Sequence, residues 1–363
     1  MRITKLTSVL LATPLKQPIR TAIHRFDQVY HVVVKVETDS GLYGTGLLFA
    51  QSVGQGRLFQ AALTAFEDKV VGEDPLMVEA IWQKLWKAMN FLGNSGVAIF
   101  AQSAIDTALW DIVGKAAGMP LCQLLGQSVR ALPVYASDGL WLSYSVEELV
   151  TEAHSFVERG FTAIKIRIGS ARLEDDIKRV RAVREAVGPD IKLIADANQG
   201  WDALTAIKFG RAVAETDLFW LEEPVPYYDL AASAAVAAAL DTALATGETE
   251  YTYLGFARLA QEKAADIWMP DLQRVGGISG LLKITRLAEV YNLPVTPHLF
   301  PEVSIHVAVC APTCKITEYV SWWDCLFEEE TKPRLVDGYL SPGTAPGLGL
   351  EITARTIEAY RVN

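Results

Sequence analysis

Three acidic residues at equal spacing constrain the fold of this 363-residue chain more than any other feature. Asp196, Glu222 and Glu248 each follow a short apolar run, and 26 residues separate each acid from the next. One strand-helix-strand unit has roughly this length. The spacing therefore predicts that the three acids lie at the same height, at the C-terminal ends of three neighbouring parallel strands.

The region around these acids alternates between strand-like and helical patterns. Amphipathic or alanine-rich helical segments separate the apolar runs, and no GxGxxG sequence follows a strand, so the fingerprint of a dinucleotide fold is missing. Eight runs over roughly 200 residues fit a closed α/β barrel better than an open doubly wound sheet. The expected strands are 132–136, 163–168, 193–195, 218–221, 242–245, 266–269, 293–296 and 315–317.

The first 126 residues show a different pattern, in which strands precede helices. Three strands are expected within residues 1–50, with a turn at 38–41, and three helices at 58–70, 78–89 and 98–118. The polar stretch 17–28 has no period and is expected to form a long loop, which is often a functional lid. These features predict a compact α+β unit that is separate from the barrel.

Composition excludes some classes of protein. The net charge of −10 and a pI near 5.1 argue against nucleic acid or an anionic membrane as a partner, but not against a small carboxylate substrate. The four cysteines form no CxxC pair, and the apolar patch near the N-terminus is short and broken by Pro14. Such a patch is too short for a signal peptide or a membrane span, so a cytoplasmic protein is expected.

Polar side chains follow the expected strands, and this pattern indicates a catalytic barrel mouth. Three carboxylates within about 4 Å repel one another by about 1 kcal/mol per pair in water, so such a cluster takes up protons or binds a cation. All-oxygen ligands favour Mg²⁺, with Mn²⁺ possible, over Zn²⁺. The strand-end residues are Ser137, Lys165, Arg167, Asp196, Asn198, Glu222, Glu248, Asp271, His298 and Glu318.

Two groups beside the acids are candidates for proton transfer. Lys165 and Arg167 alternate along one strand and are therefore expected to point together into the barrel mouth. Asp271 and His298 lie on adjacent expected strands, where a carboxylate would orient the imidazole as a general base or acid. With a cation and a further acid, Glu318, this set is suited to removing a proton α to a carboxylate.

The sequence resembles the enolase superfamily, mandelate racemase subgroup, nearly from end to end. The shared motifs are KIRIG (165–169), DANQGW (196–201), WLEEP (220–224), TGE (246–248), MPDLQRVGG (269–277), PHLF (297–300) and the terminal PGLGLE. The resemblance implies an α/β fold, a modified TIM barrel with an N-terminal α+β capping domain completed by the C-terminal tail. The expected domains are 1–126, 127–335 and 336–363, with lid loops at 17–28 and 44–55.

The resemblance also implies roles for the strand-end residues. Asp196, Glu222 and Glu248 would bind Mg²⁺, and Glu318 would hydrogen-bond the enolate oxygen. The dyad of His298 and Asp271 would be one acid/base, and the second position of a Lys-x-Lys motif would be the other. Relatives in this family are usually homo-oligomers, so a homo-oligomer is expected here.

One departure from the family pattern concerns the reaction. Arg167 stands where a racemase has its second lysine, and a guanidinium rarely gives up its proton. The expected activity is therefore a one-base dehydration, in which His298 takes the α-proton of an aldonate or aldarate and the product is a 2-keto-3-deoxy acid. The alternatives are a racemase or epimerase of a 2-hydroxy acid and, more remotely, a non-catalytic barrel that binds metal and carboxylate. A cycloisomerase is a weaker alternative, because those relatives usually carry a lysine where His298 lies.

Substrate contacts are less constrained by the sequence than the catalytic residues are. Asn198 and Ser137 are expected substrate contacts. Arg20, His24 and Arg25 in the 17–28 stretch could bind a distal carboxylate or hydroxyl groups, which would suggest a diacid, or they could simply form an exposed basic loop.

Overall fold

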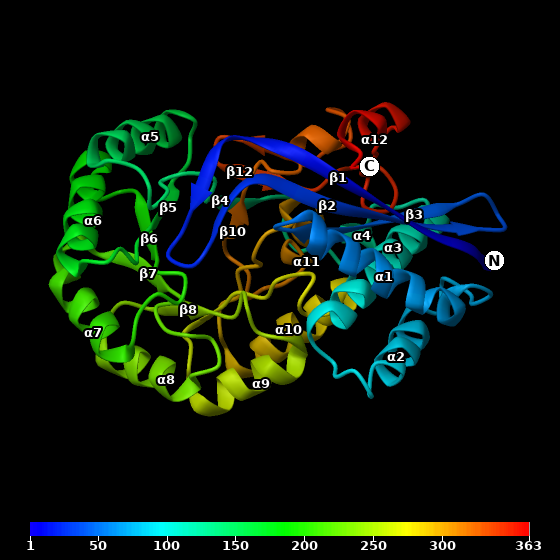
Figure 1. Ribbon diagram of the computed structural model, residues 1–363, viewed down its shortest axis with the longest axis horizontal. Coiled ribbons are helices and arrows are strands. Elements are labelled where there is room, and N and C mark those ends of the chain that lie inside the picture. Colours follow the sequence, from blue (N-terminus) through cyan, green and yellow to red (C-terminus); the bar gives the residue numbers. More distant parts are fainter. Residues whose placement is uncertain (363) are drawn as a thin grey trace.

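The computed structural model describes residues 1–362, apart from the side chain of Lys16. Its N-terminal unit is an antiparallel sheet in the order β1-β2-β3, followed by helices (Figure 1). The elements of this unit are β1 (Ile3–Arg20), β2 (Arg25–Thr38), β3 (Tyr43–Ala50), α1 (Val53–Val70), α2 (Val78–Ala88), α3 (Gly96–Ala117) and α4 (Leu121–Leu124).

The hairpin of β1 and β2 corrects the expected lid loop at 17–28. The two strands pair from Ile3 and Thr38 as far as Arg20 and Arg25, with an irregularity between Pro14 and Ile19, so only residues 21–24 form the turn. Most of the segment 44–55 is likewise ordered secondary structure, because β3 continues to Ala50 and α1 begins at Val53. Backbone pairing continues through polar residues here, and an apolar period is not needed for it.

Helix α3 packs closely on the sheet and forms the centre of the N-terminal unit. A Cβ atom at Gly44 or Gly46 would lie within about 2 Å of the carbonyl oxygen of Ala108 or Ala104, so the approach requires glycine on β3. The helix is long and apolar enough to span a membrane by composition, but 72% of its apolar window is buried inside the protein. It is therefore the core helix of this unit.

The second unit is the barrel, in which helices surround a mainly parallel sheet (Figure 1). Strands β4 to β9 are neighbours in chain order, and β10 pairs with β4. The seventh barrel position is reduced to single bridges, from Val295 to Trp268 and to Cys314, so the ladder is not continuous there. The strands are β4 (Leu132–Ala136), β5 (Ala163–Arg167), β6 (Lys192–Asp196), β7 (Leu218–Glu222), β8 (Leu244–Thr246), β9 (Ile267–Trp268) and β10 (Thr317–Tyr319).

Alternating helices cover the outside of the barrel strands. Buried apolar residues between the helices and strands include Ile164, Ile166 and Leu193, which are fully inaccessible to solvent. The alanine-rich stretch forms a helix that leads to β8, as expected. The helices are α5 (Val146–Glu158), α6 (Leu173–Val187), α7 (Ala203–Ala212), α8 (Leu230–Ala239), α9 (Thr252–Glu262), α10 (Gly277–Tyr291) and α11 (Pro301–Ala308).

The C-terminal segment serves both units. Strands β11 (Arg334–Val336) and β12 (Tyr339–Ser341) form a hairpin, and β12 pairs with the first residues of β4. This pairing keeps the chain beside the barrel as far as Ser341, five residues beyond the expected boundary at 336. Beyond it, Gly347 pairs with Pro120 and Arg361 with Leu11, and α12 (Ala354–Tyr360) lies near β1.

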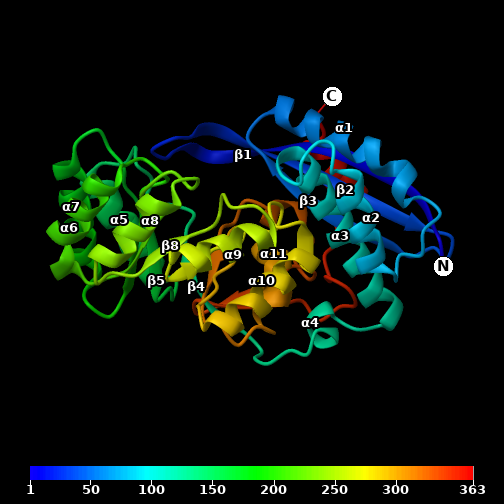
Figure 2. The ribbon, with the colours of Figure 1, turned by 90° about the horizontal axis from the view of Figure 1, so that it is seen from below.

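The arrangement of the two units places the hairpin over the barrel. In Figure 1 the β1-β2 hairpin crosses the face of the barrel, and Figure 2 shows it reaching from the N-terminal sheet towards the side of α5 and α6. The backbone N–H of Leu142, after β4, donates to the carbonyl oxygen of Arg20 (3.1 Å). The hairpin tip is thus attached to a loop at the C-terminal ends of the barrel strands.

Candidate active site

The three evenly spaced acids meet at the C-terminal ends of β6, β7 and β8. Asp196 and Glu222 are the last residues of adjacent strands and pair in register, while Glu248 follows β8. One ligand atom from each carboxylate lies within 4.8 Å of the others. Burial raises the pKa of Glu222 to about 8, and the neighbouring carboxylates add to this effect, although Lys165 opposes it. A cluster of carboxylate oxygens that repel one another is suited to binding Mg²⁺.

Lys165 lies beside this acidic group on β5. It is fully buried, and its Nζ donates to Oε1 of Glu222 (2.5 Å) and to Oε1 of Glu318 (3.0 Å). Burial by itself lowers the pKa of Lys165, but these two carboxylates outweigh burial, and the net pKa is raised. Lys165 is therefore held as a cation between two strand-end acids.

Arg167 occupies the same face of β5 but makes different contacts. Its Nη2 donates to the hydroxyl (3.1 Å) and carbonyl (3.3 Å) oxygens of Ser137, and its guanidinium lies 4.9 Å from the ring centre of Trp141. Its Nε is 3.5 Å from Oδ2 of Asp196, an ion-pair distance. The Nε and Nη1 atoms are buried and have no hydrogen-bond partner among the described residues, so they remain available to a ligand.

The dyad of His298 and Asp271 is formed across the barrel from Lys165. Nδ1 of His298 is 3.0 Å from Oδ2 of Asp271, and Oδ1 of Asp271 accepts the backbone N–H groups of Gln273 and Arg274. This bonding fixes the carboxylate and directs Nε2 of His298 towards Oε2 of Glu248, 3.3 Å away. Burial lowers the pKa of His298, but Glu248, Glu318 and Asp271 together raise it to about 9.

Glu318, at the end of β10, lies between the two basic groups. Its Oε1 accepts from Lys165, its Oε2 accepts the backbone N–H of Leu299 (2.7 Å), and Oε2 is 3.9 Å from Nε2 of His298. Burial raises the pKa of Glu318, but Lys165 and His298 outweigh it and lower the pKa overall. The carboxylate is therefore ionised between two proton-bearing groups.

These groups surround a cavity of 90 Å³ beneath the hairpin tip. Asn198 also faces it: the backbone N–H and Nδ2 of this residue donate to Asp196, while its Oδ1 is buried without a partner in the described structure. The remaining lining residues come mainly from the hairpin and from the loops after the strands. They are Ile19, Thr21, His24, Phe26, Phe49, Gln51, Trp141, Gln273, Arg274, Leu299, Val320 and Trp322.

The expected substrate contacts divide into two groups. Asn198 and His24 line the cavity, and partial burial lowers the pKa of His24. Ser137 instead lies behind Arg167 and accepts its hydrogen bonds. Arg20 and Arg25 are exposed on the hairpin and are absent from the cavity wall, because they form a pair at the outer edge of the turn.

Sequence reasoning missed the residues that approach the cavity from loops. Gln273 and Arg274 follow Asp271 directly, and Trp322 lies four residues after Glu318. Their proximity to expected strand ends was the available signal, but it does not distinguish a wall residue from a surface residue. Trp141, in the loop after β4, gave no such signal.

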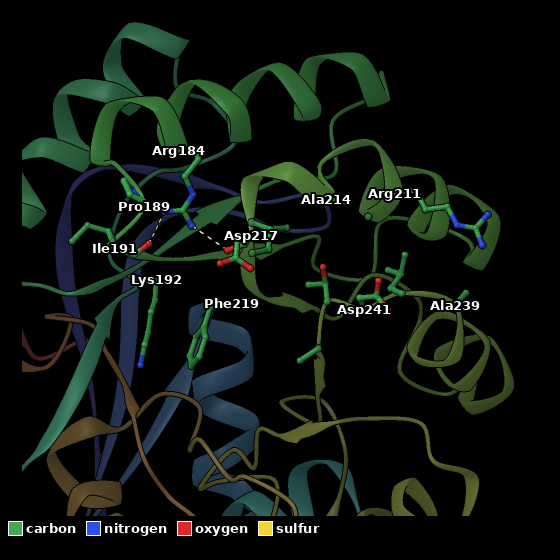
Figure 3. Close-up of a pocket in the computed structure, with 15 residues that line it drawn as sticks. Arg184, Pro189, Ile191, Lys192, Arg211, Ala214, Asp217, Phe219, Ala239 and Asp241 are labelled. Carbon is green, nitrogen blue, oxygen red and sulfur yellow. Dashed lines mark hydrogen bonds between the residues drawn. The ribbon is translucent and has the colours of Figure 1, made fainter.

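A separate hollow of 680 Å³ lies at the opposite, N-terminal ends of β6 to β8 (Figure 3). Arg184, one of its lining residues, donates to the backbone carbonyls of Gly188, Ile191, Thr216 and Asp217, so its hydrogen-bonding capacity serves the turns. This end of a barrel usually supports stability and not catalysis. The chemistry of the molecule is therefore concentrated at the hairpin-covered end.

Comparisons with known proteins agree with this arrangement. The family described as "Mandelate racemase / muconate lactonizing enzyme, N-terminal domain" matches residues 3–126, and "Enolase C-terminal domain-like" matches residues 148–356. The L-talarate/galactarate dehydratase of Salmonella typhimurium is 36% identical, over 90% of this chain and 81% of the relative. The D-galactarolactone cycloisomerase of Agrobacterium fabrum is 34% identical, over 100% of this chain and 99% of the relative.

Solved structures give the same result for the fold. The crystal structure of the Salmonella typhimurium L-talarate/galactarate dehydratase, liganded with Mg and L-lyxarohydroxamate, superimposes with a TM-score of 0.94. The superposition covers 99% of this chain and 93% of that chain, at 34% sequence identity. The likeness therefore extends over both units and the tail.

Proposed function

Because this chain belongs to the enolase superfamily, in the mandelate racemase subgroup, we propose that it is a Mg²⁺-dependent dehydratase of a sugar acid. The substrate would be an aldonate or aldarate, and the product a 2-keto-3-deoxy acid. The names of its relatives support this activity, since the Salmonella typhimurium protein that matches both in sequence and in structure is called a dehydratase. The acid group on β6, β7 and β8 supports the metal requirement.

The proposal rests on one observation: only one side of the cavity carries a group that can take up and return a proton. On one side His298 has an imidazole nitrogen directed inwards and a partner, Asp271, that stabilises its protonated form. On the other side Arg167 keeps its proton, and Ser137 and Trp141 hold its guanidinium. A dehydration needs one group that takes and returns a proton, whereas a racemisation needs a base on each face.

In this proposal His298 performs both proton transfers. With Mg²⁺ bound, the charge of Glu248, the largest cause that raises the pKa of His298, would be neutralised, and the free Nε2 would take the α-proton. The same proton then passes to the β-hydroxyl, which leaves as water, and the resulting enol tautomerises to the 2-keto-3-deoxy acid. Lys165 and Glu318 would position the substrate carboxylate and the enolate oxygen. When bound by Asp196, Glu222 and Glu248, Mg²⁺ supplies positive charge where negative charge develops as the α-proton leaves.

The test is incubation of the protein and Mg²⁺ with a panel of aldonates and aldarates that covers all stereoisomers, with detection of 2-keto acid. We expect at least one acid to give a 2-keto-3-deoxy product, and chelation of Mg²⁺ to abolish the reaction. Exchange of the α-proton with solvent deuterium, without elimination from any acid, would contradict the proposal.

A racemase or epimerase is the less favoured alternative, and it can be tested at Arg167. Inversion of a 2-hydroxy acid by the parent protein, lost in Arg167→Met, would support Arg167 as a second base. The 34% identity to a galactarolactone cycloisomerase adds a third outcome, isomerisation of a sugar-acid lactone, so the lactones of the same acids belong in the panel. Loss of one water from the substrate distinguishes dehydration from both.

We also propose that the protein acts in the cytoplasm as a homo-oligomer, with no nucleic acid or membrane partner. The acidic composition supports the exclusion of polyanionic partners. Light scattering of the purified protein would test the oligomeric state. A mass equal to one 39.8 kDa chain would contradict it.

A further inference from the structure

The loop between β4 and α5, residues 137–145, joins the active site to the hairpin. The ring of Trp141 lies 4.9 Å from the guanidinium of Arg167, and both residues line the active-site cavity. The next residue, Leu142, donates its backbone N–H to the carbonyl oxygen of Arg20 on the hairpin (3.1 Å). The conformation of this β4-α5 loop therefore determines the position of a cavity wall and the attachment of the hairpin.

The β4-α5 loop contains a strained residue, Leu140. This fully buried leucine has a φ of 48°, in the left-handed region that residues other than glycine rarely adopt. Both of its backbone groups are bonded: the N–H donates to Oε2 of Glu152 on α5 (2.6 Å), and the carbonyl oxygen accepts the N–H of Arg167 (3.0 Å). Because strained backbone persists only where surrounding contacts impose it, the bend at Leu140 depends on the residues that hold the loop.

Arg179 of α6 holds the part of the loop that follows this bend. Its side chain is buried, and its Nη1 donates to the carbonyl oxygen of Tyr144 (2.6 Å). Its Nη2 donates to the carbonyl oxygens of Trp141 (3.0 Å) and Arg167 (3.2 Å). A guanidinium offers a planar fork of donors that can bond several carbonyls at once. Arg179 thus ties the turn that carries Trp141 to the last residue of β5.

Arg179 acts on the active site only through these partners. It does not line the active-site cavity that the described residues form, whereas its partners Trp141 and Arg167 do. The general base, His298, comes from the opposite part of the barrel and has its own support in Asp271. Loss of the Arg179 bonds should therefore disturb the groups that surround a substrate and leave the proton-transfer dyad in place.

We infer that Arg179 is a positioning residue for the substrate: it holds the β4-α5 loop in the conformation that places Trp141 against Arg167 and attaches the hairpin to the barrel. The part of this inference that concerns the substrate rests on the proposed dehydratase function. In Arg179→Met the side chain retains much of its apolar bulk but bonds none of the three carbonyls, while the strain at Leu140 remains. The loop should then relax, and the cavity wall and the hairpin should move with it.

Arg184 provides a matched control on the same helix. Its guanidinium also donates to backbone carbonyl oxygens, four in all, but these lie at the opposite end of the barrel. Arg179→Met and Arg184→Met therefore remove the same kind of bond, and only the place of the lost bonds differs. Retention of the Mg²⁺-dependent rise in Tm shows that a variant is folded. If Arg179→Met fails to fold, Arg179→Lys, which lacks the planar fork but keeps the charge, replaces it.

Hydrogen exchange tests the structural part of the inference without any substrate. In Arg179→Met the backbone N–H groups of the β4-α5 loop and of the hairpin tip (19–25) are expected to exchange faster than in the parent, by about tenfold or more. In Arg184→Met these segments should exchange as in the parent. Equal exchange of the β4-α5 loop in the two variants would overturn the inference.

Steady-state kinetics test the part that concerns the substrate. In Arg179→Met, kcat/KM for dehydration should fall by about 10- to 100-fold, mainly through a higher KM, because His298 keeps its place. Arg184→Met should keep the KM of the parent. A loss confined to kcat, or an equal change of KM in both variants, would overturn the role in substrate binding. A parent protein that dehydrates no sugar acid would overturn the proposed function, and the exchange experiment would still decide whether Arg179 holds the loop.

Discussion

At the scale of single residues, the site separates one group that transfers a proton from several that hold charge. His298 reaches the cavity with Nε2 and is bonded to Asp271 through Nδ1. His298→Asn is therefore expected to lower kcat by about 10²- to 10⁴-fold, the usual contribution of a general acid/base. Mg²⁺ affinity, measured by titration calorimetry, should persist. Equal loss of turnover and of metal binding would mean that His298 is structural.

A second prediction at this scale concerns Asp196 and the metal. Mg²⁺ that binds only the folded state stabilises it by about 2.7 kcal/mol at a hundredfold excess over Kd, so Tm should rise by several degrees. In Asp196→Asn this rise should be lost, because one of three ligands is neutral. Asp202→Asn is the matched control, since exposed Asp202 only caps α7 and asparagine caps equally well. A Mg²⁺-dependent rise that persists in Asp196→Asn would exclude the carboxylate as a ligand.

Single residues also show how far the sequence could predict the site. The acids at 196, 222 and 248 could be placed together because the length of a βα unit determines their height, and the structure brings them within 4.8 Å. Arg20 and Arg25 could not be placed, because their direction depends on which way the hairpin turns. Trp141 could not be found either, since an indole in a loop is equally compatible with core and surface.

At the scale of elements, the hairpin of β1 and β2 is where sequence and structure differ most. Its outer part was expected to be a loop, because its side chains show no apolar alternation. That part crosses the barrel mouth, and only a few of its residues, such as Ile19 and Thr21, face inwards and are buried, so the alternation is too short to be recognised in the sequence. The seventh barrel strand shows the reverse case, an apolar run at 293–296 that forms only single bridges.

The contact between the hairpin tip and Gly200 can be tested with a double-mutant cycle. A Cβ atom added at Gly200 would lie 3.0 Å from Cβ of Ala22 in the turn, and also 3.0 Å from the carbonyl oxygen of Ala197. Gly200→Ala should therefore displace the tip and raise KM severalfold, with a smaller effect on kcat. Ala22→Gly removes the facing methyl group and should restore most of KM in the double variant. Strictly additive effects would show that the tip does not rest on Gly200.

At the scale of the whole molecule, polar contacts join the N-terminal unit to the barrel. The hydroxyl of Ser103 donates to the carbonyl oxygen of Leu272, and the indole N–H of Trp110 donates to the hydroxyl of Ser279. Buried Asp106 accepts both the backbone N–H and the hydroxyl of Ser279. These bonds join α3 to α10 and so connect the unit that carries the hairpin to the barrel beneath it.

Asp106 makes this junction sensitive to pH. Burial raises the pKa of Asp106 to about 7 from 3.8, although the bonds from Ser279 oppose the shift. The folded state therefore retains a proton that the unfolded state releases between about pH 4 and pH 7, so this residue lowers stability as pH rises through that window. Above pH 7 this loss in the free energy of unfolding reaches its full value, which is at most about 4 kcal/mol for a shift of three pKa units.

Asp106→Asn removes the charge but can still accept the N–H of Ser279 and donate to its hydroxyl. In EDTA, so that metal binding does not contribute, the variant should match the parent near pH 4 and exceed it in Tm by several degrees at pH 8. Exposed Asp68→Asn is the control and should give no pH-dependent difference. Parallel Tm curves for Asp106→Asn and the parent would mean that Asp106 is ionised in the folded protein throughout, with the two units joined by a charged contact.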